Sequence, residues 1–117
     1  MASIKLIADS GATKAEWCLV NGGKVKTIFT QGISPYFLNT EQITDLLVKE
    51  LKPKIKNVSV DEVFYYGTGC ANPANAKSVK KAITNVVPGA KVAVTHDLMA
   101  AARALCGRKK GIACILG

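Results

Sequence analysis

The chain has 117 residues, of which 49% are hydrophobic, which is typical of one domain with a packed core rather than of a disordered segment. Sixteen lysines and arginines against eight acidic residues give a formal net charge of +8. The basic residues are scattered along the chain and only two of them are arginine, which disfavours nucleic acid as a partner. No apolar run approaches the roughly 20 residues of a membrane span and no secretory signal opens the chain, so we expect a cytoplasmic protein without a membrane partner.

The cysteines argue against a metal centre within the chain. No two of them are in C-x-x-C spacing, and the sequence holds a single histidine. Cys18 and Cys114 lie in apolar runs, and we expect them to be buried, reduced packing residues.

The first third of the chain predicts three antiparallel strands. Apolar, β-forming runs mark them at residues 4–8, 15–21 and 25–30. An Asn-Gly-Gly triplet at 21–23 is typical of a tight hairpin turn between the second strand and the third.

A helix and a fourth strand are expected next. Asn39 or Thr40 can cap the helix, and Pro53 is expected to stop it. Residues 63–66 predict the strand, because they are rich in β-branched and aromatic side chains. The apolar positions that recur at helical spacing are Ile43, Leu46, Leu47 and Leu51.

A second helix is predicted to begin at Asn72-Pro73, where a capping residue precedes a proline at the first helical position, and to end at Pro88-Gly89. Residues 91–95 predict a fifth strand. The apolar stripe of this helix consists of Ala76, Val79, Ile83 and Val86.

The last part of the chain predicts one more helix and one more strand. Asp97 can cap the helix, over residues 98–106, and an apolar run at 111–116 predicts the strand. Three strands followed by alternating helices and strands predict an α/β domain with a mixed sheet. Because the chain ends at Gly117, directly after a strand of buried type, we expect it to be an N-terminal piece of a longer protein.

A short turn follows the first strand, and its residues alone leave open whether it is an ordinary hairpin or a turn that holds phosphate. Asp9 brings a carboxylate to the end of the strand, where ligands collect in α/β sheets. Such a carboxylate repels phosphate unless Mg²⁺ lies between them, held through water. The small residues at 11–12 let phosphate approach the backbone amides, Thr13 offers a hydroxyl, and Lys14 offers a charge or points to solvent.

Asp9, Gly11, Thr13 and Lys14 resemble the first phosphate motif, D-x-G-x-T-K, of the sugar kinase/actin superfamily. Over residues 1–117 the chain resembles the N-terminal domain of a BadF/BadG/BcrA/BcrD-type ATPase and, within that group, the N-acetylglucosamine kinases. The tripeptide GTG after the fourth strand and the run HDLMAAARAL after the fifth belong to the same likeness.

The resemblance implies a ribonuclease-H-like (actin-like ATPase) domain. Its mixed five-stranded sheet would have the order βββαβαβα, with helices on its faces and a final strand leading out. Residues 1–117 would then be the N-terminal domain of a two-domain chain, truncated before the second domain. Gly117 would open the second phosphate motif of the family.

The resemblance also implies an ATP-dependent kinase that transfers phosphate to an amino sugar such as N-acetylglucosamine, with ATP and Mg²⁺ as cofactors and Asp9 facing the metal. Asp97 would accept the proton of the sugar hydroxyl, although an aspartate there is also a common helix cap. His96 is given no catalytic role. The cofactor-binding residues would be Asp9, Ser10, Gly11, Ala12, Thr13, Lys14 and Gly117, with glycine common in the family at positions 10 and 12.

A loop at 32–37 and the turn at 67–69 would hold the sugar. Tyr36 or Phe37 could stack on a sugar face, and either could instead be a packing residue. The turn could equally be a tight connection between a strand and a helix. The implied substrate-binding residues are Ser34, Pro35, Tyr36, Gly67, Thr68, Gly69 and Asp97.

Two other functions stay open from the sequence. The ATPase activators of the same family, which drive electron transfer through an iron–sulfur cluster, would place a cysteine near Asp97, but none occurs between it and Cys106. A non-enzymatic sugar-binding module would not need Asp97. We expect the 117-residue chain alone to be inactive, because a second domain would supply half of the nucleotide-binding site. The sequence also leaves open whether the protein forms a homodimer.

Overall fold

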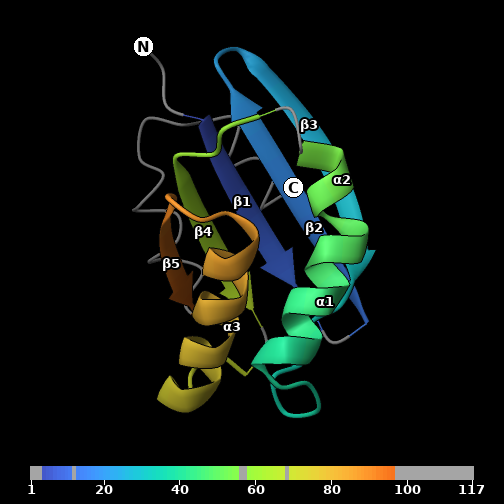
Figure 1. Cartoon of the computed structure of the whole chain (residues 1–117), viewed down its shortest axis with the longest axis vertical. Helices are drawn as coiled ribbons and strands as arrows, with labels where there is room; N and C mark the ends of the chain where they lie inside the picture. Colours follow the sequence, from blue (N-terminus) through green and yellow to red (C-terminus); the bar gives the residue numbers. More distant parts are fainter. Residues whose placement is uncertain (1–3, 12, 56–57, 68, 97–117) are drawn as a thin grey trace.

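The computed structural model describes residues 4–11, 13–55, 58–67 and 69–96. Within them a five-stranded sheet carries its two long helices, α1 and α3, side by side on one face (Figure 1). The predicted α/β class and the mixed sheet are therefore confirmed.

The five strands are β1 (Ile4–Ser10), β2 (Lys14–Asn21), β3 (Lys24–Gln31), β4 (Glu62–Gly67) and β5 (Lys91–Thr95). Each spans its predicted range, and the first four are slightly longer. Their order in the sheet is β3-β2-β1-β4-β5. β2 pairs antiparallel with both of its neighbours, whereas β4 runs parallel to β1 and to β5. The opening meander and the later crossovers thus share one sheet.

The first helix, α1 (Thr40–Glu50), begins with a capping box. The Asn39 side chain accepts a hydrogen bond from the Gln42 amide at 2.8 Å, and the Gln42 side chain accepts one from the Asn39 amide at 3.0 Å. Pro53 was expected to end the helical stretch, but it lies inside a short second helix, α2 (Lys52–Ile55). A proline is tolerated in the first turn of a new helix, because the amide it lacks has no intrahelical partner there.

The last described helix, α3 (Pro73–Val86), begins as predicted. The Asn72 side chain accepts hydrogen bonds from the amides of Ala74 and Asn75, at 2.9 and 3.3 Å. The predicted helix at 98–106 and the predicted strand at 111–116 lie outside the described residues.

The main core lies between one face of the sheet and the two long helices. Trp17, from β2, is fully buried, its indole donates a hydrogen bond to the Thr30 hydroxyl at 3.0 Å, and its ring centroid lies 5.8 Å from that of Tyr65. The apolar stripes predicted for the helices supply the other side of this core. Their buried members are Ile43, Leu47, Leu51, Val79, Ile83 and Val86.

The opposite face of the sheet carries a second, smaller cluster. Ile7, Cys18 and Val20 are buried there, with Phe64 packed against them. Cys18 is buried as predicted but is disulfide-bonded, so the expectation that it is reduced is wrong. An apolar run predicts the burial of a thiol but carries no information on its oxidation state.

Among the described residues, no helix is long and apolar enough to cross a membrane.

Candidate active site

The carboxyl ends of three parallel strands meet at one edge of the sheet. In the register of β1 and β4, Asp9 lies opposite Tyr66 and Ser10 opposite Gly67, while Tyr66 in turn lies opposite Thr95 of β5. Ligands in open α/β sheets bind beyond the carboxyl ends of the strands. The topology therefore brings the turn after β1 and the turn after β4 to the edge of the sheet where a ligand-binding site is expected.

A cavity of about 280 Å³ opens at this edge. That volume is close to the roughly 300 Å³ at which the range of small-molecule pockets begins. Its lining comes from the ends of β1, β4 and β5, three segments that are far apart in the sequence. The lining residues are Asp9, Ser10, Gly11, Tyr66, Gly67, Gly69 and His96.

The turn after β1 presents Asp9 and the backbone of Gly11 to this cavity. The Gly11 amide donates a hydrogen bond to the Lys14 carbonyl at 2.9 Å, which closes the turn. Thr13 and Lys14 are exposed, and the Lys14 ammonium lies 4.6 Å from the centre of the Phe29 ring. Their contacts with phosphate stay predictions, and Ala12 lies outside the described residues.

Asp9 is suited to hold Mg²⁺ through water. Its carboxylate is half-buried at the cavity, and Mg²⁺ in proteins commonly keeps several waters while using one or two carboxylates together with substrate phosphates. The donor set that the described residues offer is therefore compatible with a metal held between Asp9 and phosphate oxygens.

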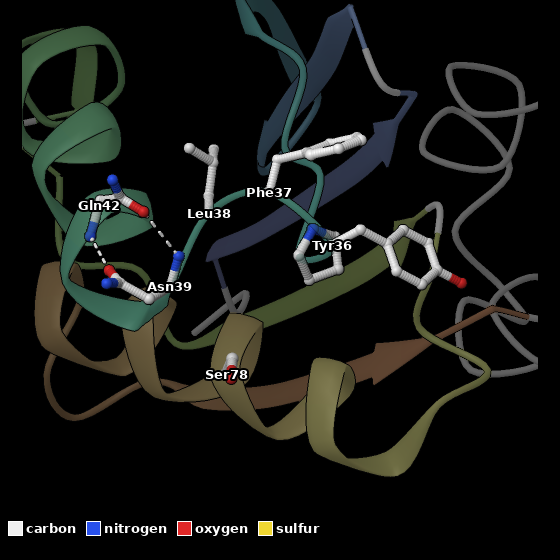
Figure 2. Close-up of a pocket in the computed structure, with 7 residues that line it drawn as sticks. Tyr36, Phe37, Leu38, Asn39, Gln42 and Ser78 are labelled. Atoms are coloured by element: carbon white, nitrogen blue, oxygen red, sulfur yellow. Dashed lines mark hydrogen bonds between the residues drawn. The ribbon is translucent and has the colours of Figure 1, made fainter.

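The loop predicted to contact the sugar lies between β3 and α1. Ser34 is buried, and its carbonyl accepts hydrogen bonds from the amides of Phe37 and Leu38 at 3.0 and 2.9 Å. The Tyr36 side chain is 65% exposed and, like Phe37, extends away from the Asn39–Gln42 pair (Figure 2). The loop also borders a second cavity, of about 400 Å³, which is lined by Pro35, Tyr36, Phe37, Leu38, Asn39, Gln42 and Ser78.

The two segments predicted to bind sugar contact each other. Gly69 has φ +82°, and a Cβ built on it would lie 2.9 Å from the Tyr36 ring and 3.1 Å from the Pro35 ring. At Gly67 a Cβ would overlap the Tyr65 ring. Gly67 is therefore required by close packing and Gly69 by its positive φ, and the aromatic loop rests on the turn that lines the main cavity.

Replacing Gly69 by alanine is expected to destabilise the protein more than the same change at Gly89. Both glycines have positive φ, so each variant should lose about 1–2 kcal/mol of unfolding free energy to left-handed strain. No atom lies within 4 Å of the Cβ position at Gly89, whereas Tyr36 and Pro35 crowd the one at Gly69, which adds about 1 kcal/mol or more. Urea unfolding measures the difference, and equal losses would contradict the packing argument.

Two residues of the main cavity were not among the predicted site residues: Tyr66 was not singled out, and His96 was given no catalytic role. Tyr66 lies opposite Asp9 in the parallel pairing, and His96 follows directly after β5. Their positions at the carboxyl ends of predicted parallel strands were the available signal. Thr68, Asp97 and Gly117 lie outside the described residues, and their predicted roles stay predictions.

The chain is similar to the solved structure of a proposed N-acetylglucosamine kinase from Porphyromonas gingivalis, with 39% sequence identity and a TM-score of 0.72. The match covers 87% of this chain and 37% of that kinase, so the chain spans well under half of its length. YeaZ from Pseudomonas aeruginosa matches with 18% identity and a TM-score of 0.43, over 92% of this chain and 51% of its own. No protein-family model and no curated protein matches the chain.

The match to the Porphyromonas gingivalis protein combines substantial sequence identity with the same fold over most of this chain. The mixed sheet, the meander of its first three strands and the helices that follow agree with the architecture implied by the phosphate motif. The α/β fold expected from the sequence and the resemblance to the N-acetylglucosamine kinases are thus confirmed.

Proposed function

We propose that the chain is the N-terminal domain of an ATP-dependent sugar kinase that transfers phosphate to an amino sugar such as N-acetylglucosamine. The observation that carries the proposal is the cavity that gathers Asp9, Gly11, Gly67 and Gly69 at one edge of the sheet. The 39% identity to a proposed N-acetylglucosamine kinase supports the choice of substrate class. Within this proposal the protein is a cytoplasmic BadF-type family member.

The turn after β1 would hold the phosphate end of the nucleotide. Its backbone approaches the cavity closely at Gly11, and Asp9 would position Mg²⁺ through water. When bound, the metal would neutralise charge on the phosphates. A second domain would supply the adenosine contacts, which is consistent with the chain spanning 37% of the length of the Porphyromonas gingivalis protein.

Asp97 would accept the proton of the attacking sugar hydroxyl. It comes directly after His96, which lines the cavity. Phosphoryl transfer passes through a loose transition state, so a carboxylate that orients the hydroxyl is sufficient and strong basicity is not needed. Tyr36 would offer its exposed ring face to the sugar while it rests on Gly69.

Nucleotide and sugar titrations on a protein that carries both domains test this function. A kinase releases ADP in proportion to N-acetylglucosamine and forms the sugar phosphate. Nucleotide hydrolysis that does not depend on sugar would instead favour an activator-type ATPase. Sugar binding without nucleotide turnover would favour a non-enzymatic module.

The 117-residue chain by itself is expected to fold and yet to release no sugar-dependent ADP. Closure of two domains excludes water and aligns the reacting groups, and one domain cannot supply that closure. The purified chain is assayed for ADP release with and without N-acetylglucosamine. Release above background that disappears in an Asp97→Asn variant would contradict this expectation.

A further inference from the structure

The Ser10 hydroxyl links the turn after β1 to the loop after β3. Ser10 is 2% exposed, and its oxygen accepts a hydrogen bond from the Ile33 amide at 3.1 Å. The same hydroxyl donates to the Gly11 carbonyl at 3.2 Å. One buried side chain therefore contacts the backbone of two segments, the proposed phosphate turn and the proposed sugar loop at 32–37.

The bond to Ile33 fixes where the sugar loop begins. Ile33 is fully buried, and a buried backbone amide that loses its acceptor is costly, so the loop is anchored at the position of the Ser10 hydroxyl. A displacement of Ser10 is therefore transmitted to Ile33.

The far end of the same loop rests on the other wall of the cavity. The rings of Tyr36 and Pro35 pack against Gly69, and the Gly69 carbonyl accepts a hydrogen bond from the Asn75 side chain at 3.3 Å. The loop is thus held at one end by the turn that would contact phosphate and at the other by the turn that would contact sugar. Such a two-ended attachment can pass a shift at one ligand to the other.

We propose that Ser10 is a positioning residue that couples nucleotide binding to sugar binding, through its hydrogen bonds to Gly11 and Ile33. The inference rests on the proposed kinase function and goes beyond it, because it assigns to one hydroxyl the energetic link between the two ligands. Phosphates that settle against the turn at Gly11 shift the Ser10 hydroxyl and, with it, the Ile33 amide at the start of the sugar loop. By linkage, sugar must strengthen nucleotide binding by the same factor.

Calorimetry measures this coupling in a protein that carries both domains. The Kd for N-acetylglucosamine is determined with and without Mg²⁺ and the β,γ-methylene analogue of ATP. In the unmodified protein the nucleotide should lower the Kd for sugar by about 5-fold or more, within the usual range of coupling between sites. Ser10→Ala should reduce that factor to nearly one, whatever change it makes to the Kd of each ligand measured alone.

Thr30→Val is the matched control. The Thr30 hydroxyl is also buried, accepts one hydrogen bond, from Trp17 at 3.0 Å, and donates another, to the Gln31 carbonyl at 2.9 Å, but it does not join the two turns. Thermal melting should show comparable destabilisation in both variants, with the coupling factor lost only in Ser10→Ala. Coupling that is absent from the unmodified protein, kept in Ser10→Ala or lost equally in both variants overturns the inference alone. If the unmodified protein binds neither nucleotide nor sugar, the proposed kinase function is overturned as well.

Discussion

Asp97→Asn is expected to lower kcat with N-acetylglucosamine by about 10²–10⁴-fold in a protein that carries both domains, as the loss of a positioned general base commonly does. That loss corresponds to roughly 3–5 kcal/mol of activation free energy. The asparagine amide cannot accept the hydroxyl proton, so kcat should fall far more than the affinity for sugar. Steady-state kinetics together with the Kd for sugar separate the two effects.

The choice of asparagine at position 97 keeps stability out of the comparison. Asparagine caps helices about as well as aspartate, whereas Asp97→Ala would add about 1 kcal/mol of destabilisation. Asp45→Asn is the control, because it removes the same charge from an exposed position in α1. An Asp97→Asn protein that melts normally and keeps kcat within a few-fold of the unmodified enzyme would reduce Asp97 to a helix cap.

Asp9→Asn is expected to raise the Mg²⁺ concentration needed for half-maximal activity by about 10–100-fold, the usual effect of losing a partner that acts on a metal from its outer shell. Asp9 is half-buried at the end of β1, so asparagine fits the same space and the fold should persist. The measurement is kinase activity over a Mg²⁺ titration at saturating ATP and sugar.

Asp61→Asn provides the control for this experiment. The Asp61 carboxylate accepts a hydrogen bond from the Ile4 amide at 2.7 Å, at the opposite end of β1, and an asparagine oxygen can still accept that bond. The variant therefore makes the same change of charge far from the cavity, and its Mg²⁺ dependence should not change. If Asp9→Asn behaves like Asp61→Asn, Asp9 is an ordinary turn residue.

Local signals explain why the strands and the two long helices could be predicted. Asn39 and Asn72 both make the capping bonds that their positions suggested, and the alternating apolar runs placed each strand. The short α2 was not predicted, because Pro53 was expected to end the helical stretch, whereas it lies in the first turn of a new helix. Helix caps and strands are local in sequence, and this is why spacing was enough to place them.

The site could be predicted only in part. Motif spacing and strand order placed Asp9 and Gly67 at the same edge, because parallel strands end together. The contact between Tyr36 and Gly69 and the bond between Ser10 and Ile33 join segments that no local pattern relates. Such contacts depend on how loops fold over the finished sheet, so only the structure could reveal them.

The strand order has a consequence for how this domain assembles. β1, β2 and β3 are neighbours in sequence and in the sheet, so the meander can pair without any later segment of the chain. The parallel partner of β1 is β4, and Lys5 meets Glu62 only after the intervening chain has closed a long loop. We therefore expect the three-stranded meander to form early, with Asp9 at an open edge. The cavity would take shape late, when β4 docks and completes the ligand-binding edge of the sheet.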